Sequence, residues 1–192
     1  GLRWGPAEQM GVYKSTDGGA HWIRASSGLT DTDVIVVAVD PTDPQLVYAG
    51  SPRGNVFRSS DGGGNWTWSG SGVVVKNEWA TIWDIVPDPE APGIVYLAQS
   101  NEGVSEQGGI YKSTDYGMTW DRVLKGHDPR ALVIDPVDHD VLIAASWNDY
   151  LHRSEDGGDT WSIYDADAFP GYPYVRALAI GRTDGGWRLY AG

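Results

Sequence analysis

Two arginines, an indole and a carboxylate occupy corresponding positions in a series of short apolar segments. Each lies four or five residues before the end of its segment, and the set is Trp83, Asp84, Arg130 and Arg176. A guanidinium is a planar fork of N–H donors that suits a carboxylate, sulfate or phosphate. The flat face of tryptophan can stack on a sugar or an aromatic ring. We therefore predict that these side chains converge on a site for a glycan, an anionic small molecule or a protein segment.

In the alternative interpretation, the same arginines bind no ligand and have a structural role. Buried charges need partners, so Arg130 and Arg176 could pair with Asp84, Asp128 or Glu78 and simply close the channel between the strands. Both interpretations place the guanidiniums at the same position in the fold. They differ in what the guanidiniums contact.

Further aromatic and acidic residues lie in the loops expected around this site. Trp79 and Trp147 complete the predicted ligand-binding set, and the other loop candidates are Trp4, Tyr172, Tyr174, Glu78, Glu102, Glu106 and Asp149. Glycoside hydrolysis would need two carboxylates about 5 to 10 Å apart. Spacing along the chain does not give that distance, so no catalytic residue is assigned.

The composition limits cofactors and partners. The chain has no cysteine, and its four histidines (His21, His127, His139 and His152) are scattered, so no metal site or cofactor is predicted. With 26 acidic and 14 basic side chains the net charge is -12, which would repel nucleic acid. No apolar run reaches the roughly 20 residues that span a bilayer. A glycan or a protein is therefore the expected partner, without membrane insertion.

The elements that must position these residues come from a repeat. The pattern Ser-x-Asp-x-Gly-x-x-Trp occurs four times, at 15–22, 59–66, 113–120 and 154–161, each time after a short apolar strand. Ser and Asp bond to backbone groups two or three residues on, Gly supplies positive φ, and Trp anchors the following strand. Each pattern therefore predicts a hairpin. Its Asp and Trp residues are Asp17, Trp22, Asp61, Trp66, Asp115, Trp120, Asp156 and Trp161.

A second strand pair recurs between the hairpins, and with one hairpin it makes a four-stranded unit. The predicted pairs are 34–40 with 46–49, 82–87 with 94–98, 131–135 with 141–145, and 175–180 with 187–191. Four strands per repeat predict an all-β protein of β-propeller blades, a single domain over 1–192. The first strand of each unit is nearly all apolar, so we expect burial to be greatest there and to decrease outward.

The ends of the chain suggest how the ring closes. Residues 189–192 match 47–50, and 11–15 supply the strand that should follow. We therefore expect the terminal strands to complete one blade, giving a monomeric closed ring without open sheet edges. The alternatives are assembly with further blades or two chains that combine their blades.

The four hairpin motifs and the Asp-Pro turns at 40–44 and 135–138 resemble the Asp-box (BNR) repeat superfamily of β-propellers, over essentially the whole chain. That superfamily includes sialidases, xyloglucan-cleaving endoglucanases, sortilin-type receptors and photosystem assembly factors. The resemblance implies that the Asp-box hairpins lie away from the ligand face, so their aspartates are structural. It also favours a secreted or cell-surface location.

Departures from the catalytic branches shape the functional prediction. The Phe/Tyr-Arg-Ile-Pro sequence typical of sialidases is absent, and so is the acidic segment typical of the endoglucanases. We predict a non-catalytic binding or scaffold propeller, with the ligand on the face opposite the Asp-boxes. The alternatives are a glycoside hydrolase, sialidase-like or endoglucanase-like, or part of one, and a purely structural module.

Overall fold

The computed structural model describes residues 10–75, 79–101, 107–147, 151–164, 175–183 and 186–192. Every named element in this part of the chain is a β-strand. Within the same residues, no helix is long and apolar enough to cross a membrane.

Three complete four-stranded antiparallel sheets follow one another along the chain, and we call them blades 1 to 3. Blade 1 holds β3 (Val36–Val39), β4 (Val47–Gly50), β5 (Val56–Ser59) and β6 (Thr67–Trp68). Blade 2 holds β7 (Ala80–Pro87), β8 (Val95–Asn101), β9 (Gly109–Ser113) and β10 (Asp121–Lys125). Blade 3 holds β11 (Pro129–Ile134), β12 (Leu142–Ser146), β13 (Leu151–Ser154) and β14 (Ser162–Tyr164).

Two-stranded hairpins flank the three blades. β1 (Tyr13–Lys14) pairs with β2 (Ile23–Arg24), and β15 (Leu178–Thr183) pairs with β16 (Gly186–Ala191). By their place in the repeat, β1 and β2 are the third and fourth strands of a blade, and β15 and β16 are the first and second. Each flanking hairpin is thus half a blade.

The register is the same in all three blades. The second and third strands pair so that the serine of the hairpin motif lies opposite the start of the second strand: Val47 with Ser59, Val95 with Ser113, and Leu142 with Ser154. Because a shift of one residue would exchange the two faces of a strand, this shared register fixes which side chains face each neighbouring blade.

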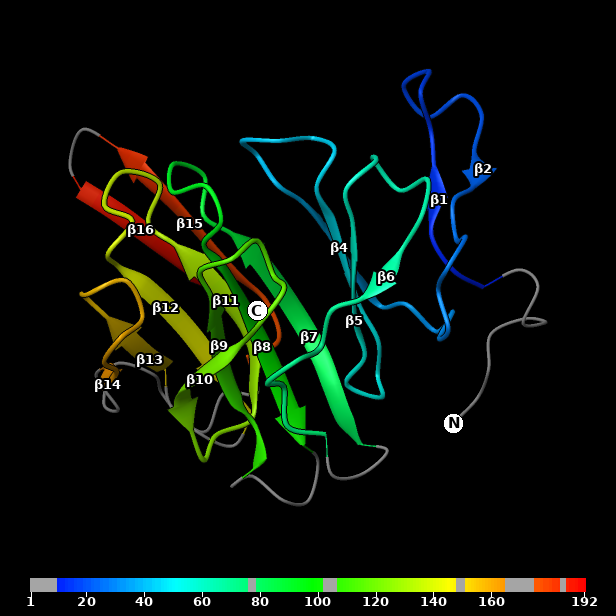
Figure 1. Ribbon diagram of the computed structural model, residues 1–192. Helices are drawn as coiled ribbons and strands as arrows, with labels where there is room; N and C mark the ends of the chain where they lie inside the picture. The colour runs from blue at the N-terminus through cyan, green and yellow to red at the C-terminus, as the bar shows by residue number, and fades with distance from the viewer. Residues whose placement is uncertain (1–9, 76–78, 102–106, 148–150, 165–174, 184–185) are drawn as a thin grey trace.

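The blades stack in chain order around their first strands. β3 contacts β7, β7 contacts β11, and β11 contacts β15. In Figure 1 the β1–β2 hairpin lies at the right and the β15–β16 hairpin at the left of the molecule. Among the described strands, β1 pairs only with β2 and β16 only with β15. The expected closure by terminal strands is therefore not observed, and the described blades form an open series.

Burial peaks in the second strand of each blade, which corrects the expectation that the innermost strand is most buried. All residues of β4, β8 and β12 are buried, whereas β3 alternates between half-buried and exposed. The second strand has a hydrogen-bonded neighbour on both edges and a blade on each face. The first strand has one edge without a hydrogen-bonded neighbour. It is therefore less buried than the second strand, although its residues are nearly all apolar.

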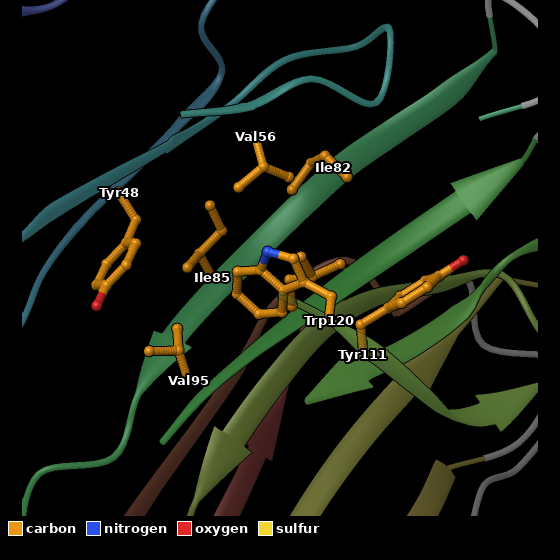
Figure 2. Close-up of a cluster of buried hydrophobic side chains, with 8 residues drawn as sticks. Tyr48, Val56, Ile82, Ile85, Val95, Tyr111 and Trp120 are labelled. Atoms are coloured by element: carbon orange, nitrogen blue, oxygen red, sulfur yellow. The ribbon is translucent and has the colours of Figure 1, made fainter. Parts of the chain in front are cut away.

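The hydrophobic core lies between blades. Figure 2 shows the cluster between blades 1 and 2, where Tyr48 and Val56 meet Ile85, Tyr111 and Trp120. A second cluster joins blades 2 and 3, and a third joins blade 3 to β15 and β16. Each fully buried large apolar side chain contributes on the order of 1.5–3 kcal/mol. Because that burial needs two sheets, a single blade would lose most of its stabilisation.

The hairpin motif folds into one hydrogen-bonded turn. In blade 1 the Ser59 hydroxyl donates to Asp61 Oδ1 (2.8 Å) and accepts the N–H of Gly63 (2.9 Å), whose φ is 87°. The two oxygens of Asp61 accept the backbone N–H and the side-chain amide of Asn65, at 2.8 and 2.9 Å. Equivalent bonds occur in the turns at 15–22, 113–120 and 154–161.

The tryptophan that ends the motif has two environments. Trp66 and Trp120 are both 3% exposed and donate their indole N–H to a carbonyl of the segment leaving the preceding sheet, at 2.8 and 2.7 Å. Trp22 and Trp161 instead donate within their own turns, at 3.1 and 2.9 Å. Of these four indoles, Trp66 and Trp120 thus donate their N–H to another sheet, whereas Trp161 contributes to the blade 2 to blade 3 junction only by packing against its apolar cluster.

Candidate functional site

Two predicted site residues lie at β-bulges in neighbouring inner strands. The pairing of β7 with β8 shifts between Ile82 and Asp84, and that of β11 with β12 shifts between Pro129 and Ala131. The extra residues are Trp83 and Arg130. A bulge re-aims the side chain it carries, so both side chains are released from the regular alternation of the strand.

Arg176 lies at a third irregularity of the same kind. Its N–H and that of Ala177 both donate to the carbonyl oxygen of Gly192, at 2.8 and 3.0 Å, so two residues on one strand face one on the other. This doubling is the hydrogen-bond pattern of a bulge. Three consecutive inner strands thus present an irregular residue at the same position in the repeat.

Four of the predicted side chains form one stack. The guanidinium of Arg130 lies 4.6 Å from the ring centroid of Trp83 and 4.2 Å from that of Trp147, which follows β12. The guanidinium of Arg176 lies 5.0 Å from the Trp147 ring. We call this alternating series of indole, guanidinium, indole and guanidinium the Trp-Arg ladder. It draws on blade 2, blade 3 and the segment that leads into β15.

The ladder is pre-organised by its own contacts. A guanidinium over an indole contributes about 0.5–1 kcal/mol when exposed and about 2 when desolvated. Arg130 is 8% exposed and contacts both rings, so its contacts belong at the upper end of that range. Stacking engages the faces of the guanidinium and leaves the N–H bonds in its plane, where they can donate hydrogen bonds.

The indole of Trp83 is also held by a hydrogen bond. Its N–H donates to the Ser100 hydroxyl at 2.7 Å, which ties the bulge to β8. Trp147 is held through its backbone, because its N–H donates to the carbonyl of Asp128 at 2.9 Å. The Asp128 carboxylate accepts the N–H of Asn101 at 2.9 Å. The ends of β8 and β12 are thereby connected through Asp128.

Asp84 contacts the neighbouring backbone. Its Oδ2 accepts the N–H of Leu132 at 3.0 Å and so links β7 to β11, one residue beyond Trp83 and two residues beyond Arg130. Burial raises the pKa of this carboxyl, and the bonds from the N–H groups of Leu132 and Ile85 offset only part of that effect. Asp84 is therefore both an inter-blade link and the carboxyl in this region whose protonated form is favoured.

The remaining predicted residues divide into two groups. Trp79 is 56% exposed and lies just before β7. The loop candidates Trp4, Glu78, Glu102, Glu106, Asp149, Tyr172 and Tyr174 lie outside the described residues. The acidic residues that a glycoside hydrolase would need for catalysis are all in this second group, apart from Asp84.

A polar cluster at the rim of blade 1 was not singled out from the sequence. Arg53 contacts Asp31 at 3.0 Å and Asp33 at 3.4 Å, and the side-chain amide of Asn55 donates to Asp31 at 3.1 Å. These contacts join residues 20 to 24 positions apart, and no local spacing signals their meeting. No group of three or more acidic or histidine side chains placed to hold a metal ion occurs in the described ranges.

Comparison with known proteins gives a consistent fold. No family model matches the chain. The xyloglucanase Xgh74A of Acetivibrio thermocellus is 34% identical over 101 residues, which is 45% of this chain and 12% of that protein. The chain thus spans about an eighth of the length of this relative.

Solved structures agree with this match. The crystal structure of an ancestral GH74 enzyme superposes with a TM-score of 0.73 at 22% identity, over 95% of this chain and 24% of that one. The GH74 enzyme of Niastella koreensis gives a TM-score of 0.63 at 26% identity, over 80% and 26% of the two chains. The sheets described above are accordingly blades of the β-propeller type, as the sequence predicted.

Proposed function

We propose that these blades, which share the propeller fold of GH74 xyloglucanases, belong to a glycan-binding propeller whose Trp-Arg ladder contacts the polysaccharide. The observation that carries the proposal is the alternating stack of Trp83, Arg130, Trp147 and Arg176 on successive inner strands. The similarity to a xyloglucanase supports a β-glucan of the xyloglucan type as the ligand.

The chemistry of the ladder suits a sugar chain. Apolar C–H faces of a pyranose pack on indole rings, while in-plane guanidinium N–H groups donate to sugar hydroxyls. Because each ring already rests on a guanidinium, binding would immobilise few additional rotamers, and that lowers the entropic cost of association. Arg176 is exposed and ends the ladder, so it is the member that a ligand would reach from solvent.

In this proposal the hairpin turns have no contact with the ligand. Their carboxylates are engaged by Ser, backbone N–H groups and the side chain four residues on, within one turn. Asp84 acts as a link that fixes β11 beside the ladder, through its bond to Leu132. The described residues then supply binding, and no catalytic residue is assigned among them.

Titration calorimetry with xyloglucan oligosaccharides tests the proposal. We expect Trp147→Ala to weaken binding about tenfold, or about 1.4 kcal/mol, because it removes the ring between two guanidiniums. Trp68→Ala is the matched control, since Trp68 is 57% exposed on the outer strand of blade 1 and should bind as wild type does. Absence of binding by the wild type, or equal binding by all three proteins, would refute the proposal.

Hydrolysis is the second candidate function, favoured by the names of the relatives. It would require the chain to act within a protein of the relatives' length, because it spans 12% to 26% of those proteins. Glycosidases use a protonated acid beside a second carboxylate, and Asp84 has the raised pKa that the acid needs. Release of reducing ends that is lost in Asp84→Asn would favour this function, and absence of release would leave binding alone.

A further inference from the structure

Two glycines let the backbone of one blade lie directly against the preceding blade. Gly54 and Gly108 precede the third strands of blades 1 and 2, each five residues before the serine of the hairpin motif. A Cβ atom on Gly108 would lie 2.3 Å from the carbonyl oxygen of His127, and one on Gly54 would lie 2.8 Å from that of Ala80. Carbon and oxygen atoms normally approach to about 3.3 Å. Both close approaches therefore require the absence of a side chain.

The two carbonyl groups occupy the same position in the repeat. Ala80 lies three residues before Trp83, and His127 lies three residues before Arg130. Each carbonyl group belongs to the segment that leads into the inner strand of the next blade, β7 or β11. The glycine of blade 1 thus contacts the backbone that leads to Trp83, and the glycine of blade 2 contacts the backbone that leads to Arg130. Two members of the Trp-Arg ladder share one mode of contact with the preceding blade.

The residue after each carbonyl group adds a hydrogen bond to the preceding blade. The Thr81 hydroxyl donates to the carbonyl of Pro52 at 3.3 Å, and the Asp128 carboxylate accepts the N–H of Asn101 at 2.9 Å. Pro52 follows the second strand of blade 1, and Asn101 ends that of blade 2. At each of these two junctions, the incoming segment is therefore fixed by a close approach and by a hydrogen bond.

The segment between blades 2 and 3 also holds a third ladder member. The carbonyl of Asp128 accepts the N–H of Trp147 at 2.9 Å. The ring of His127 lies against that of His152 on β13, with 4.1 Å between the ring centroids. Because Arg130 follows Asp128 by two residues, the place of this segment on blade 2 sets the positions of both Arg130 and Trp147.

We propose that Gly54 and Gly108 are positioning residues of the ladder, each setting how closely a ladder side chain of the next blade approaches the blade before it. The consequence for ligand binding rests on the proposed glycan-binding function. A side chain at position 108 would displace the incoming segment from blade 2 by about 1 Å, the difference between its approach and a normal contact. Trp83 is anchored in blade 2 by its bond to Ser100, so it would not follow. The contact between Trp83 and Arg130 would therefore loosen.

The two glycines differ in a way that isolates this contact. Gly54 has a φ of 72°, in the left-handed region, so glycine also serves the turn there. The φ of Gly108 lies outside that region. An alanine at position 108 is therefore compatible with the local backbone, and its cost comes from crowding against His127, Asp128 and Gln99. Gly108→Ala tests the positioning role without a change in turn conformation.

Nuclear magnetic resonance of the ligand-free chain tests the proposal. Protons above the face of an indole resonate upfield, and the Arg130 guanidinium lies over the rings of Trp83 and Trp147. In Gly108→Ala we expect the side-chain resonances of Arg130 to move toward the values of an unstacked arginine. Gly181→Ala is the matched control, because a Cβ atom there has nothing within 4 Å and the φ is not left-handed. Unchanged Arg130 resonances in Gly108→Ala overturn the proposal.

A second pair of variants covers the case in which Gly108→Ala does not fold. Asp128→Ala removes the acceptor of the Asn101 N–H without adding volume, whereas Asp128→Asn keeps an oxygen at that place. We expect the indole N–H resonance of Trp147 to shift in Asp128→Ala and to remain near its wild-type position in Asp128→Asn. A resonance that stays in place in Asp128→Ala, or moves equally in both variants, overturns the proposal.

Calorimetry with xyloglucan oligosaccharides measures the effect on binding. We expect Gly108→Ala to weaken binding about tenfold, because a displacement of about 1 Å misaligns the site. Gly181→Ala should bind as the wild type does. Equal binding by Gly108→Ala and the wild type would overturn the positioning role. A wild type that does not bind would instead refute the proposed glycan-binding function, and the Arg130 resonances would still decide the positioning role.

Discussion

The two rims of these blades are built on opposite principles. On one rim, the same eight-residue turn recurs, and each carboxylate finds its partners inside its own turn. On the other, a single ladder gathers Trp83, Arg130, Trp147 and Arg176 from distant parts of the chain. Repetition therefore marks the structural rim, and the unrepeated rim is where a specific function can reside.

The carboxylates show the same contrast. Hydrogen bonds from the side chain and N–H of Asn65, and from Ser59, lower the pKa of Asp61 to about 2. Asp156 has a pKa of about 2 for the same reasons, with Thr160 in place of Asn65. Burial raises the pKa of Asp84. One residue type is thus held ionised on one rim and driven toward its neutral form near the other.

The largest expected effect is a difference in stability between substitutions of the same tryptophan in two of the four hairpin motifs. Trp120→Ala should lower the free energy of unfolding by about 3–5 kcal/mol, because it opens a cavity between blades 1 and 2. Trp22→Ala should change it by less than about 1 kcal/mol, because Trp22 is 62% exposed. Urea denaturation followed by circular dichroism measures both. Equal losses in the free energy of unfolding would mean that this tryptophan stabilises its own turn and that packing between blades adds nothing.

A smaller effect tests the turn itself. Ser113 is 1% exposed, and its hydroxyl bonds to Asp115 at 2.7 Å and to the N–H of Gly117 at 2.9 Å. Ser113→Ala should cost about 1–2 kcal/mol, because it leaves buried groups without partners. Ser162→Ala, on an exposed strand, should stay within about 0.5 kcal/mol of wild type. Thermal unfolding of both variants decides whether the turn depends on its serine.

The smallest effect sharpens the contrast between the carboxyls. The raised folded pKa of Asp84 means that its ionised form destabilises the fold at neutral pH, and that this cost disappears as the pH falls toward the ordinary value of 3.8. The free energy of unfolding of the wild type should therefore rise relative to that of Asp84→Asn as the pH falls from 7 to 4.

The turn aspartates have the opposite sign. Their lowered pKa adds stability above the ordinary value, and that stability is lost as the pH falls from about 4 toward 2. Asp61→Asn is thus the matched control, and its difference from wild type should shrink only at the acid end. Urea midpoints measured from pH 7 to 3 give both curves. Parallel curves for the two variants would contradict the assignment.

The blades were predictable because their signals are local. The Ser-x-Asp-x-Gly-x-x-Trp pattern predicted the hairpins, and apolar strand pairs between the patterns predicted four strands per blade. Turn residues act over three or four positions, so a linear sequence contains nearly all of that information. Aligning the repeats also selected the inner-strand positions of Trp83, Arg130 and Arg176.

The arrangement of the site required tertiary structure. The bulges at Trp83 and Arg130 depend on pairing with the next strand, and no residue type in the sequence predicts them. The bond from Leu132 to Asp84 joins residues 48 positions apart. The burial of the second strands depends on blades on both faces. These features arise from stacking, so composition and spacing along one strand could not reveal them.

The bulges in β7 and β11 let one residue of each strand differ from the pattern that the rest of the strand must keep. The residues on either side keep the alternation that blade stacking requires, while the extra residue is exempt from it. That position holds tryptophan in β7 and arginine in β11, with no change in how the following residues pair. A substitution at this place in the repeat can therefore change the side chain presented at the rim while the architecture stays constant.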